Sequence, residues 1–597
     1  MKKASLFIII LIFLPYSLAI GQQEQAAEKA DPMRNFSLID ETMPVAENMK
    51  EGFESITAKD AVAYLKFLSN DLLEGRDTAS EGYDIAALYA ASMFELWGVE
   101  PAGDMERQSF DFRRMIRGET QPPRKRTYFQ NIAFLETLGR EGQASVTLQK
   151  GQMKKTKDFL PDLDYSYDGS GTQSITAPVV FVGYGIQEPS LKFDEYKNLD
   201  VKGKFVMMLS EAPGKGDPAS PFTQGELKEK YFPERRMMRR RQSRSPKFTT
   251  ARELGAEAVL LVENSPEENP EITRSTLDEQ RIDDEETIYP VPRRRMTLAD
   301  STVPSRFGES IQTIRISRKM ADEILKLVGQ DIETLKDKIE TTLESHSMAL
   351  PGVMFTIENK AKTKLLNSMN VLGYIEGSDP ELKNEAVVIG AHLDHEGRRG
   401  DYIFNGADDN GSGSVGVMEI AEAFAKNPVK PKRSIVFALW TGEEKGLYGS
   451  HYYVMHPFIE KTTANLNLDM ISRIYEQEDL AMMSRRWGDI GKDIIEKIDT
   501  QKYAEYEFDA SAPDIGEIIR KNNSFVGLHL RFQEPGRSMG GSDHMPFDQS
   551  DIPWVYFSAA MTEDYHEPSD TVDKVSPDLM EKIIRITYLT AFDLADK

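Results

Sequence analysis

The sequence predicts an α/β fold, in which a mostly parallel or mixed central sheet is flanked by helices and a small β-rich domain is inserted. Three observations predict it. Short apolar runs alternate with helical stretches after Asn367, amphipathic helical segments precede residue 160, and a block of short strands lies between them. Short apolar runs are typical of buried parallel strands, and their alternation with helices indicates a sheet covered on both faces.

Length and composition limit the class of protein. A chain of 597 residues is too long for one ordinary hydrophobic core. Its 40% hydrophobic content indicates a globular protein, and its net charge of −24 argues against nucleic acid or an anionic membrane as the main partner. The chain has no cysteine, which excludes disulfides and thiolate metal sites. Any metal must therefore be held by His, Asp and Glu.

The N-terminus has the layout of a secretory signal peptide over residues 1–21. Lys2 and Lys3 give a basic start, residues 6–18 are almost wholly apolar, and residues 19–21 offer a cleavage point. We therefore expect export to the periplasm or medium of a bacterium, with no stable membrane insertion after signal removal. An uncleaved anchor is the alternative, although the apolar run is short for spanning.

The rest of the chain divides into four expected parts. Residues 22–55 are polar and are expected to be a flexible leader, whereas residues 56–164 carry two helical patterns. Residues 165–350 form the expected β-rich insert with little helix. Residues 351–597 complete the domain that residues 56–164 begin. The insert also contains a basic run and an acidic run, interpreted as solvated loops or helix faces, at residues 235–247 and 267–286.

Candidate ligands follow the predicted strands of the last part. His392 comes just after the apolar run 386–390, and Glu443 and Glu444 come just after the run 435–439. Ligands of open α/β folds bind at the carboxyl ends of strands. We therefore expect these side chains to lie near one another.

The spacing of further acidic and histidine residues indicates a site for two metals. Seven of the eight histidines lie between His392 and His566, and Asp409 and Asp469 lie between the same two residues. One shared carboxylate, with one His and one acidic residue for each metal, would leave positions open for water. Zinc suits this mixture of donors, and two metals can activate one water for hydrolysis. A calcium loop of the EF-hand type at 406–412 would need a different spacing of oxygens.

These motifs together resemble the M28 family of dizinc exopeptidases, and the insert resembles a protease-associated domain. The resemblance implies a zinc-exopeptidase fold of the phosphorylase/hydrolase-like type. It rests on six motifs in the family's order: His392-Leu393-Asp394, Gly406 to Gly413, Gly442-Glu443-Glu444, Asn467-Leu468-Asp469, Ser542-Asp543-His544 and Tyr565-His566.

The resemblance implies two zinc ions per chain and a role for each motif. His392 and Asp469 would bind one zinc, and Glu444 and His566 the other. Asp409 would bridge the two, while Asp408 would be structural and Asn410 and Gly411 would shape the turn. The remaining roles concern the reaction: Asp394 would orient the His392 imidazole, Glu443 would be the general base, and Tyr565 would donate to the oxyanion.

The expected function is a secreted zinc-dependent aminopeptidase that hydrolyses N-terminal residues of peptides. A carboxypeptidase remains an alternative, because Arg398, Arg399, Arg531 and Arg537 could approach the site. A glutaminyl cyclase-like transferase is disfavoured because all five positions for two metals are filled. A non-catalytic binding or receptor protein is disfavoured by the intact Glu443. The sequence assigns no role to His395 or His544 and does not indicate the oligomeric state, the side-chain preference or the role of the insert.

Overall fold

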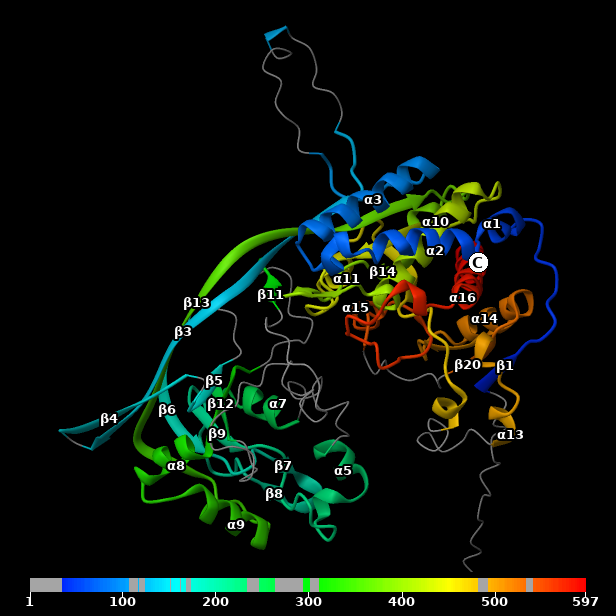
Figure 1. Cartoon of the computed structure of the whole chain (residues 1–597). Helices are drawn as coiled ribbons and strands as arrows, with labels where there is room; N and C mark the ends of the chain where they lie inside the picture. Colours follow the sequence, from blue (N-terminus) through cyan, green and yellow to red (C-terminus); the bar gives the residue numbers. More distant parts are fainter. Residues whose placement is uncertain are drawn as a thin grey trace, which may run out of the picture.

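The computed structural model describes residues 35–106, 116–117, 124–150, 152–161, 163–167, 173–232, 246–262, 294–300, 311–481, 492–532 and 541–597. A helix-flanked sheet forms one body, which we call the catalytic body. The insert is connected to it by the two long strands β3 (Phe129–Lys150) and β13 (Met348–Ile375) (Figure 1). The expected signal peptide lies outside the described residues. Residues 263–293, which include the acidic run, lie outside them as well. Within the described ranges, no helix is both long enough and apolar enough to cross a bilayer.

The central sheet is mixed, which confirms the predicted fold class. Its middle strands β17, β14, β18 and β21 run parallel, whereas β13 pairs antiparallel with β17 and β19 pairs antiparallel with β21. The strands in spatial order are β2 (Glu100–Pro101), β13, β17 (Ser434–Trp440), β14 (Glu385–His392), β18 (Lys461–Leu468), β21 (Trp554–Ser558), β19 (Tyr503–Phe508), β20 (His529–Phe532) and β1 (Phe36–Leu38).

Alternation of side chains along the central strands divides the core between two faces of the sheet. Ile435, Phe437 and Leu439 of β17 join one apolar cluster, while Val436 and Trp440 join another. This period of two is what a pleated strand imposes. The helices of the first face are α2 (Ala58–Leu68), α3 (Glu81–Trp97), α10 (Gly413–Lys426), α14 (Pro513–Val526) and α16 (Pro577–Asp596); those of the second are α11 (Tyr448–Met455) and α15 (His544–Asp548).

The two N-terminal helices begin and end where their sequence dictates. The Thr57 side chain accepts a hydrogen bond from the Asp60 backbone N–H at the start of α2, and Ser80 does the same for Tyr83 at the start of α3. Gly98 ends α3 with a φ of +77°, a conformation that favours glycine. Between the helices, a 3₁₀ segment at Asp71–Arg76 turns the chain toward the ends of the central strands.

Residues 35–55 are ordered, which corrects the expectation of a flexible leader over 22–55. Strand β1 pairs antiparallel with β20, and α1 (Lys50–Ser55) packs against α10 and α16. Phe36 and Met49 are buried there, so their apolar side chains hold this polar segment to the domain. The sequence signal was weak because few apolar residues are spread over a long polar stretch.

The insert contains its own apolar core and more helix than expected. Its strands in spatial order are β5 (Tyr165–Tyr167), β12 (Thr313–Ile316), β10 (Ala258–Val262), β9 (Phe205–Leu209) and β6 (Gln173–Phe181), followed by β13, β3 and β4 (Met153–Phe159). A short hairpin is formed by β7 (Gln187–Glu188) and β8 (Phe193–Asp194). The helices are α5 (Gly225–Tyr231), α7 (Pro246–Glu253), α8 (Arg318–Lys326) and α9 (Ile332–Thr342). Most of the basic run, residues 233–245, lies outside the described residues.

Candidate metal centre

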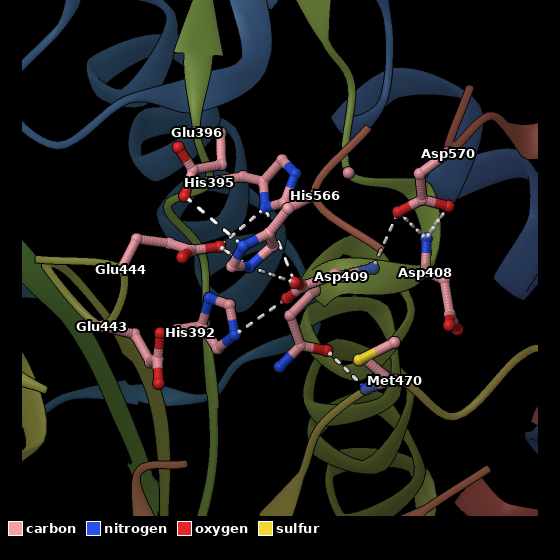
Figure 2. Close-up of polar contacts among 12 residues, drawn as sticks. His392, His395, Glu396, Asp408, Asp409, Glu443, Glu444, Met470, His566 and Asp570 are labelled. Carbon is pink, nitrogen blue, oxygen red and sulfur yellow. Dashed lines mark hydrogen bonds and ion pairs between the residues drawn. The ribbon is translucent and has the colours of Figure 1, made fainter. Parts of the chain in front are cut away.

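The predicted ligands come together at the carboxyl ends of four neighbouring parallel strands. His392 is the last residue of β14, Glu444 follows β17, Asp469 follows β18, and His566 lies in the loop after β21. Asp409 lies in the segment before α10. Figure 2 shows His392, Asp409, Glu444 and His566 pointing toward one another. The parallel register of the strands therefore brings together residues that are far apart in sequence.

Asp409 presents one carboxylate oxygen to each of two groups of donors. Its Oδ1 lies 3.3 Å from His392 Nε2, which in turn lies 3.5 Å from Asp469 Oδ1. Its Oδ2 lies 3.0 Å from His566 Nε2, which lies 3.2 Å from Glu444 Oε1. The arrangement gives two adjacent donor groups that share Asp409.

The spacing within each group fits a tetrahedral zinc site. Zinc holds nitrogen and oxygen donors at about 2.0–2.2 Å, so donors on a tetrahedron stand roughly 3.3–3.6 Å apart. The two distances of the first group, 3.3 and 3.5 Å, lie in this range, and those of the second group, 3.0 and 3.2 Å, lie slightly below it. Three groups of donors in the described part of the chain lie close enough to hold one ion, and the group formed by His392, Asp409 and Asp469 is the one in which every residue is buried.

The hydrogen bonding of His392 supplies a second test of fit. Its Nδ1 lies 2.9 Å from the Asp394 carbonyl oxygen, which can only accept, so Nδ1 carries the proton. The Nε2 of the neutral ring is then a lone pair facing the carboxylates of Asp409 and Asp469. Asp469 Oδ1 is buried without a hydrogen-bond partner among the described residues. A cation between these atoms satisfies all three.

Buried charge around the centre is also unbalanced. The buried carboxyl groups outnumber the buried Arg and Lys side chains beside them by at least two to one, and burying unpaired charge is costly. The carboxyl groups include those of Asp394, Glu396, Asp409, Glu444, Asp469 and Asp543, and the cations are Arg76, Arg399 and Lys445. Burial raises the pKa of Asp543 to about 7, against the lowering effect of His392 and Ser450. Divalent cations would supply the missing positive charge.

Asp394 supports His392 through its main chain rather than its side chain. Its carboxylate instead accepts from the Thr78 hydroxyl at 2.8 Å and from the Glu443 backbone N–H at 3.1 Å. Burial raises the pKa of Asp394 to about 6. Asp394 thereby connects the His392 strand end to the loop that carries Glu443.

Glu443 and Tyr565 lie beside the donors. The side chain of Glu443 points away from His566 and lies near His392 (Figure 2). Burial, together with neighbouring carboxylates, raises the pKa of Glu443 well above its usual range. The Tyr565 ring stacks on His566 with centroids 3.8 Å apart. Burial and the charges of Asp409 and Glu444 raise the pKa of the Tyr565 phenol, so it stays protonated and able to donate.

Two site residues received no role from the sequence. His395 is fully buried with Nδ1 2.9 Å from Glu444 Oε1 and 4.0 Å from Asp409 Oδ2, so it joins the second donor group. Glu396 lies with its Oε1 3.7 Å from His566 Nδ1 and forms an ion pair with Arg399. Their position within four residues of His392 was the only available signal. His544, by contrast, stacks between Trp554 and Tyr556 on the second face of the sheet.

Other buried groups hold the segment that presents Asp409. The Asp570 carboxylate accepts from the backbone N–H groups of Asp408 and Asp409 at 3.0 Å (Figure 2). The Asp408 side chain accepts from Ser472, and the Asn410 amide donates to the Leu468 carbonyl. The chain places Asp408 and Asn410 in structural contacts, away from both donor groups.

Arg76 ties the N-terminal part to the same centre. Its guanidinium donates to the carbonyls of Leu393, Asn405 and Gly406, and it is fully buried. It thus braces the loop after His392 and the loop before Asp409 at once. A buried arginine in a tight turn cannot be told from an exposed one by local sequence.

Comparison with known proteins identifies a family for the part of the chain that contains the candidate metal centre. Residues 370–591 match the family model described as Peptidase family M28. This region belongs to peptidase family M28. The M28 region contains every residue of both donor groups, from His392 to His566.

Individual relatives are similar over part of their length. Leucine aminopeptidase 2 of Trichophyton rubrum is 32% identical over 271 residues, which are 42% of this chain and 46% of that protein. A probable glutamate carboxypeptidase of Arthroderma benhamiae is 35% identical over 126 residues, 20% of this chain and 16% of that protein. The chain thus spans less than half the length of these curated relatives.

A solved aminopeptidase from Aneurinibacillus sp. strain AM-1 aligns with 91% of this chain and 95% of its own chain, at 18% identity and a TM-score of 0.45.

Proposed function

We propose that the chain is a zinc-dependent exopeptidase, and specifically an aminopeptidase that acts on peptides. The observation that carries the proposal is Asp409, whose two carboxylate oxygens each face a separate His and acidic pair. His392 and Asp469 would hold one zinc, and Glu444 and His566 the other. The M28 match and the name of the leucine aminopeptidase relative support the same activity.

The residues around the donors have distinct parts in this reaction. Zinc, when bound, would lower the pKa of a water and polarise the scissile carbonyl. Glu443 would take a proton from the attacking water and return it to the leaving amine. The Tyr565 hydroxyl would donate to the oxygen that gains charge during attack. Asp394 would hold His392 and the Glu443 loop in register.

The arginines that left a carboxypeptidase as an alternative each form an ion pair within the chain, where the structure describes them. Arg398 pairs with Glu74, Arg399 with Glu396, and Arg531 with Glu505. Arg537 lies outside the described residues. A carboxypeptidase needs a guanidinium or ammonium group for the terminal carboxylate of its substrate, and these three guanidiniums already pair with carboxylates of the chain. These ion pairs favour removal of N-terminal residues.

The deciding experiment compares one peptide in three forms: free, blocked at the N-terminus and blocked at the C-terminus. An aminopeptidase cleaves the free and C-terminally blocked forms and leaves the N-terminally blocked form intact. The opposite pattern would establish the carboxypeptidase. Glu443→Gln serves as the matched inactive control for contaminating peptidases.

We also propose export of the protein. The basic and apolar start of the chain supports it, and the lack of cysteine is compatible with the periplasm or the medium. Comparing the N-terminal residue of the protein from the periplasm with that of the whole chain tests the proposal. Protein found only in the cytoplasm with Met1 retained would refute it.

A further inference from the structure

One short strand of the chain between the insert strands β10 and β12 leaves the insert and pairs with the catalytic body. Strand β11 (Arg295–Leu298) runs antiparallel to β3, with Leu298 opposite Phe134. Met296 is buried in a cluster with Ile132 and Phe134, against which Tyr448 of α11 packs. In Figure 1, β11 lies apart from β12, close to the body that holds the metal centre.

Arg294, the residue before β11, reaches the N-terminal part of the catalytic body. Its Nε lies 2.7 Å from Glu136 Oε1, and one of its terminal nitrogens lies 2.9 Å from Asp77 Oδ2. The same terminal nitrogen donates to the Thr78 carbonyl oxygen at 3.0 Å. The Arg294 guanidinium thus contacts both Asp77, through its carboxylate, and Thr78, through its backbone carbonyl.

Two lines of contact run from this pair to the metal centre. Asp77 Oδ1 lies 2.8 Å from Lys445 Nζ, whose side chain is 4% exposed and whose backbone follows Glu444. The Thr78 hydroxyl donates to Oδ2 of Asp394, and Oδ1 of the same carboxylate accepts from the Glu443 backbone N–H. Asp394 also supports His392 through its carbonyl. Every contact in these two series joins buried or largely buried groups, and networks of polar contacts between buried groups are rigid.

We propose that Arg294 is a positioning residue through which the insert sets the geometry of the Glu443–Glu444 loop and of His392. The insert therefore completes the catalytic centre rather than only flanking it. Loss of the Arg294 guanidinium releases Asp77 and Thr78, so Lys445 and Asp394 lose their anchors while every group that meets substrate remains. The expected consequence is slower turnover with little change in substrate affinity. This inference rests on the peptidase activity proposed above.

The test is Arg294→Gln, with Arg295→Gln as its matched control. Arg295 is the exposed first residue of β11 and follows Arg294 directly in the chain. We expect Arg294→Gln to lower kcat by about 10- to 100-fold with KM within about three-fold, because small misplacements of reacting groups cost this much. Arg295→Gln should match the wild type. A kcat of Arg294→Gln within about two-fold of wild type would overturn the proposal.

Two further measurements separate positioning from general loss of folding. In Arg294→Ala, added methylguanidinium should restore turnover in a saturable way, whereas no recovery in a folded variant would contradict a positioning role. Zinc affinity, measured by competition with a chelator, should fall in Arg294→Gln but not in Arg295→Gln. This last measurement needs no peptidase activity. If the wild type cleaves no peptide, the proposed function fails while the affinity comparison still tests the link from Arg294.

Discussion

Asp409 is the residue on which the two donor groups depend. It is 3% exposed and lies within 3.3 Å of His392 on one side and 3.0 Å of His566 on the other. Burial and the charge of Glu444 raise its pKa, but the neighbouring imidazoles of His392 and His566 outweigh them and hold the pKa well below its usual range. The carboxylate therefore favours its ionised form, the form that binds metal.

Glu443 provides the first prediction at the scale of single residues. Glu443→Gln keeps the shape of the side chain but removes its ability to take a proton. We expect zinc content equal to that of the wild type and a kcat lower by roughly 10²- to 10⁴-fold. Zinc analysis beside steady-state kinetics measures both. Undiminished turnover in this variant would refute the assignment of the general base.

His395 provides the second prediction. Its Nδ1 contacts Glu444, and its Nε2 has no hydrogen-bond partner among the described residues. His395→Ala should weaken binding of one of two zinc ions by about 10- to 100-fold, the usual effect of removing a support for a ligand. His456→Ala, which changes an exposed histidine, is the control. Equal zinc affinities in the two variants would remove His395 from the site.

Sequence could nominate ligands because each lies beside a strand end and belongs to a residue type that binds metal. It could not nominate Arg76, Thr78 or Arg294, because their importance comes from contacts across the fold. Arg294 is 217 residues from Asp77 in the chain. For Asp394, the sequence indicated support of His392 but could not show that the carbonyl oxygen provides it.

At the scale of secondary structure elements, strand β17 contributes one row of side chains to each face of the sheet. Leu439 is fully buried on the face covered by α10 and α16, whereas Leu96 of α3 is 74% exposed. Leu439→Ala should lower the free energy of unfolding by about 2–5 kcal/mol, and Leu96→Ala by no more than about 0.5 kcal/mol. Chemical denaturation measures both. Similar losses in the two variants would contradict the assigned burial.

Helix α10 carries a buried acid whose ionisation opposes folding. Burial, followed by the charge of Glu422, raises the pKa of Glu419 to about 8 from an ordinary 4.5. As pH rises from about 4.5 to 8, the unfolded chain releases this proton before the folded chain does, so stability falls. Denaturation at several pH values should show a flatter curve for Glu419→Gln over this range. Parallel curves would show that Glu419 does not titrate this way.

The long strands β3 and β13 show where element prediction from the sequence stops. The insert was expected to begin at residue 165 and end at residue 350, yet β13 runs unbroken from Met348 to Ile375. It pairs with β3 along most of this length and then joins the central sheet beside β17. Composition changes along such a strand as its surroundings change, so a compositional boundary does not mark a structural one.

At the scale of the whole molecule, the chain forms a helix-flanked sheet and an insert, and the candidate metal centre lies at one edge of that sheet. The parallel strands bring His392, Glu444, Asp469 and His566 to one edge of the sheet, and the N-terminal turn and the insert brace that edge from outside. The mixed α/β architecture was predictable from alternating apolar runs. The bracing was not, because it depends on how β11 docks on β3.

The zinc content of the metal-saturated protein tests the central claim most directly. We expect two zinc ions per chain in the wild type and fewer in Asp409→Asn, because this substitution weakens the carboxylate that both groups share. Mass spectrometry under native conditions gives the count for each chain. A wild type that saturates at one zinc per chain, with Asp409→Asn unchanged, would contradict a two-metal centre bridged by Asp409.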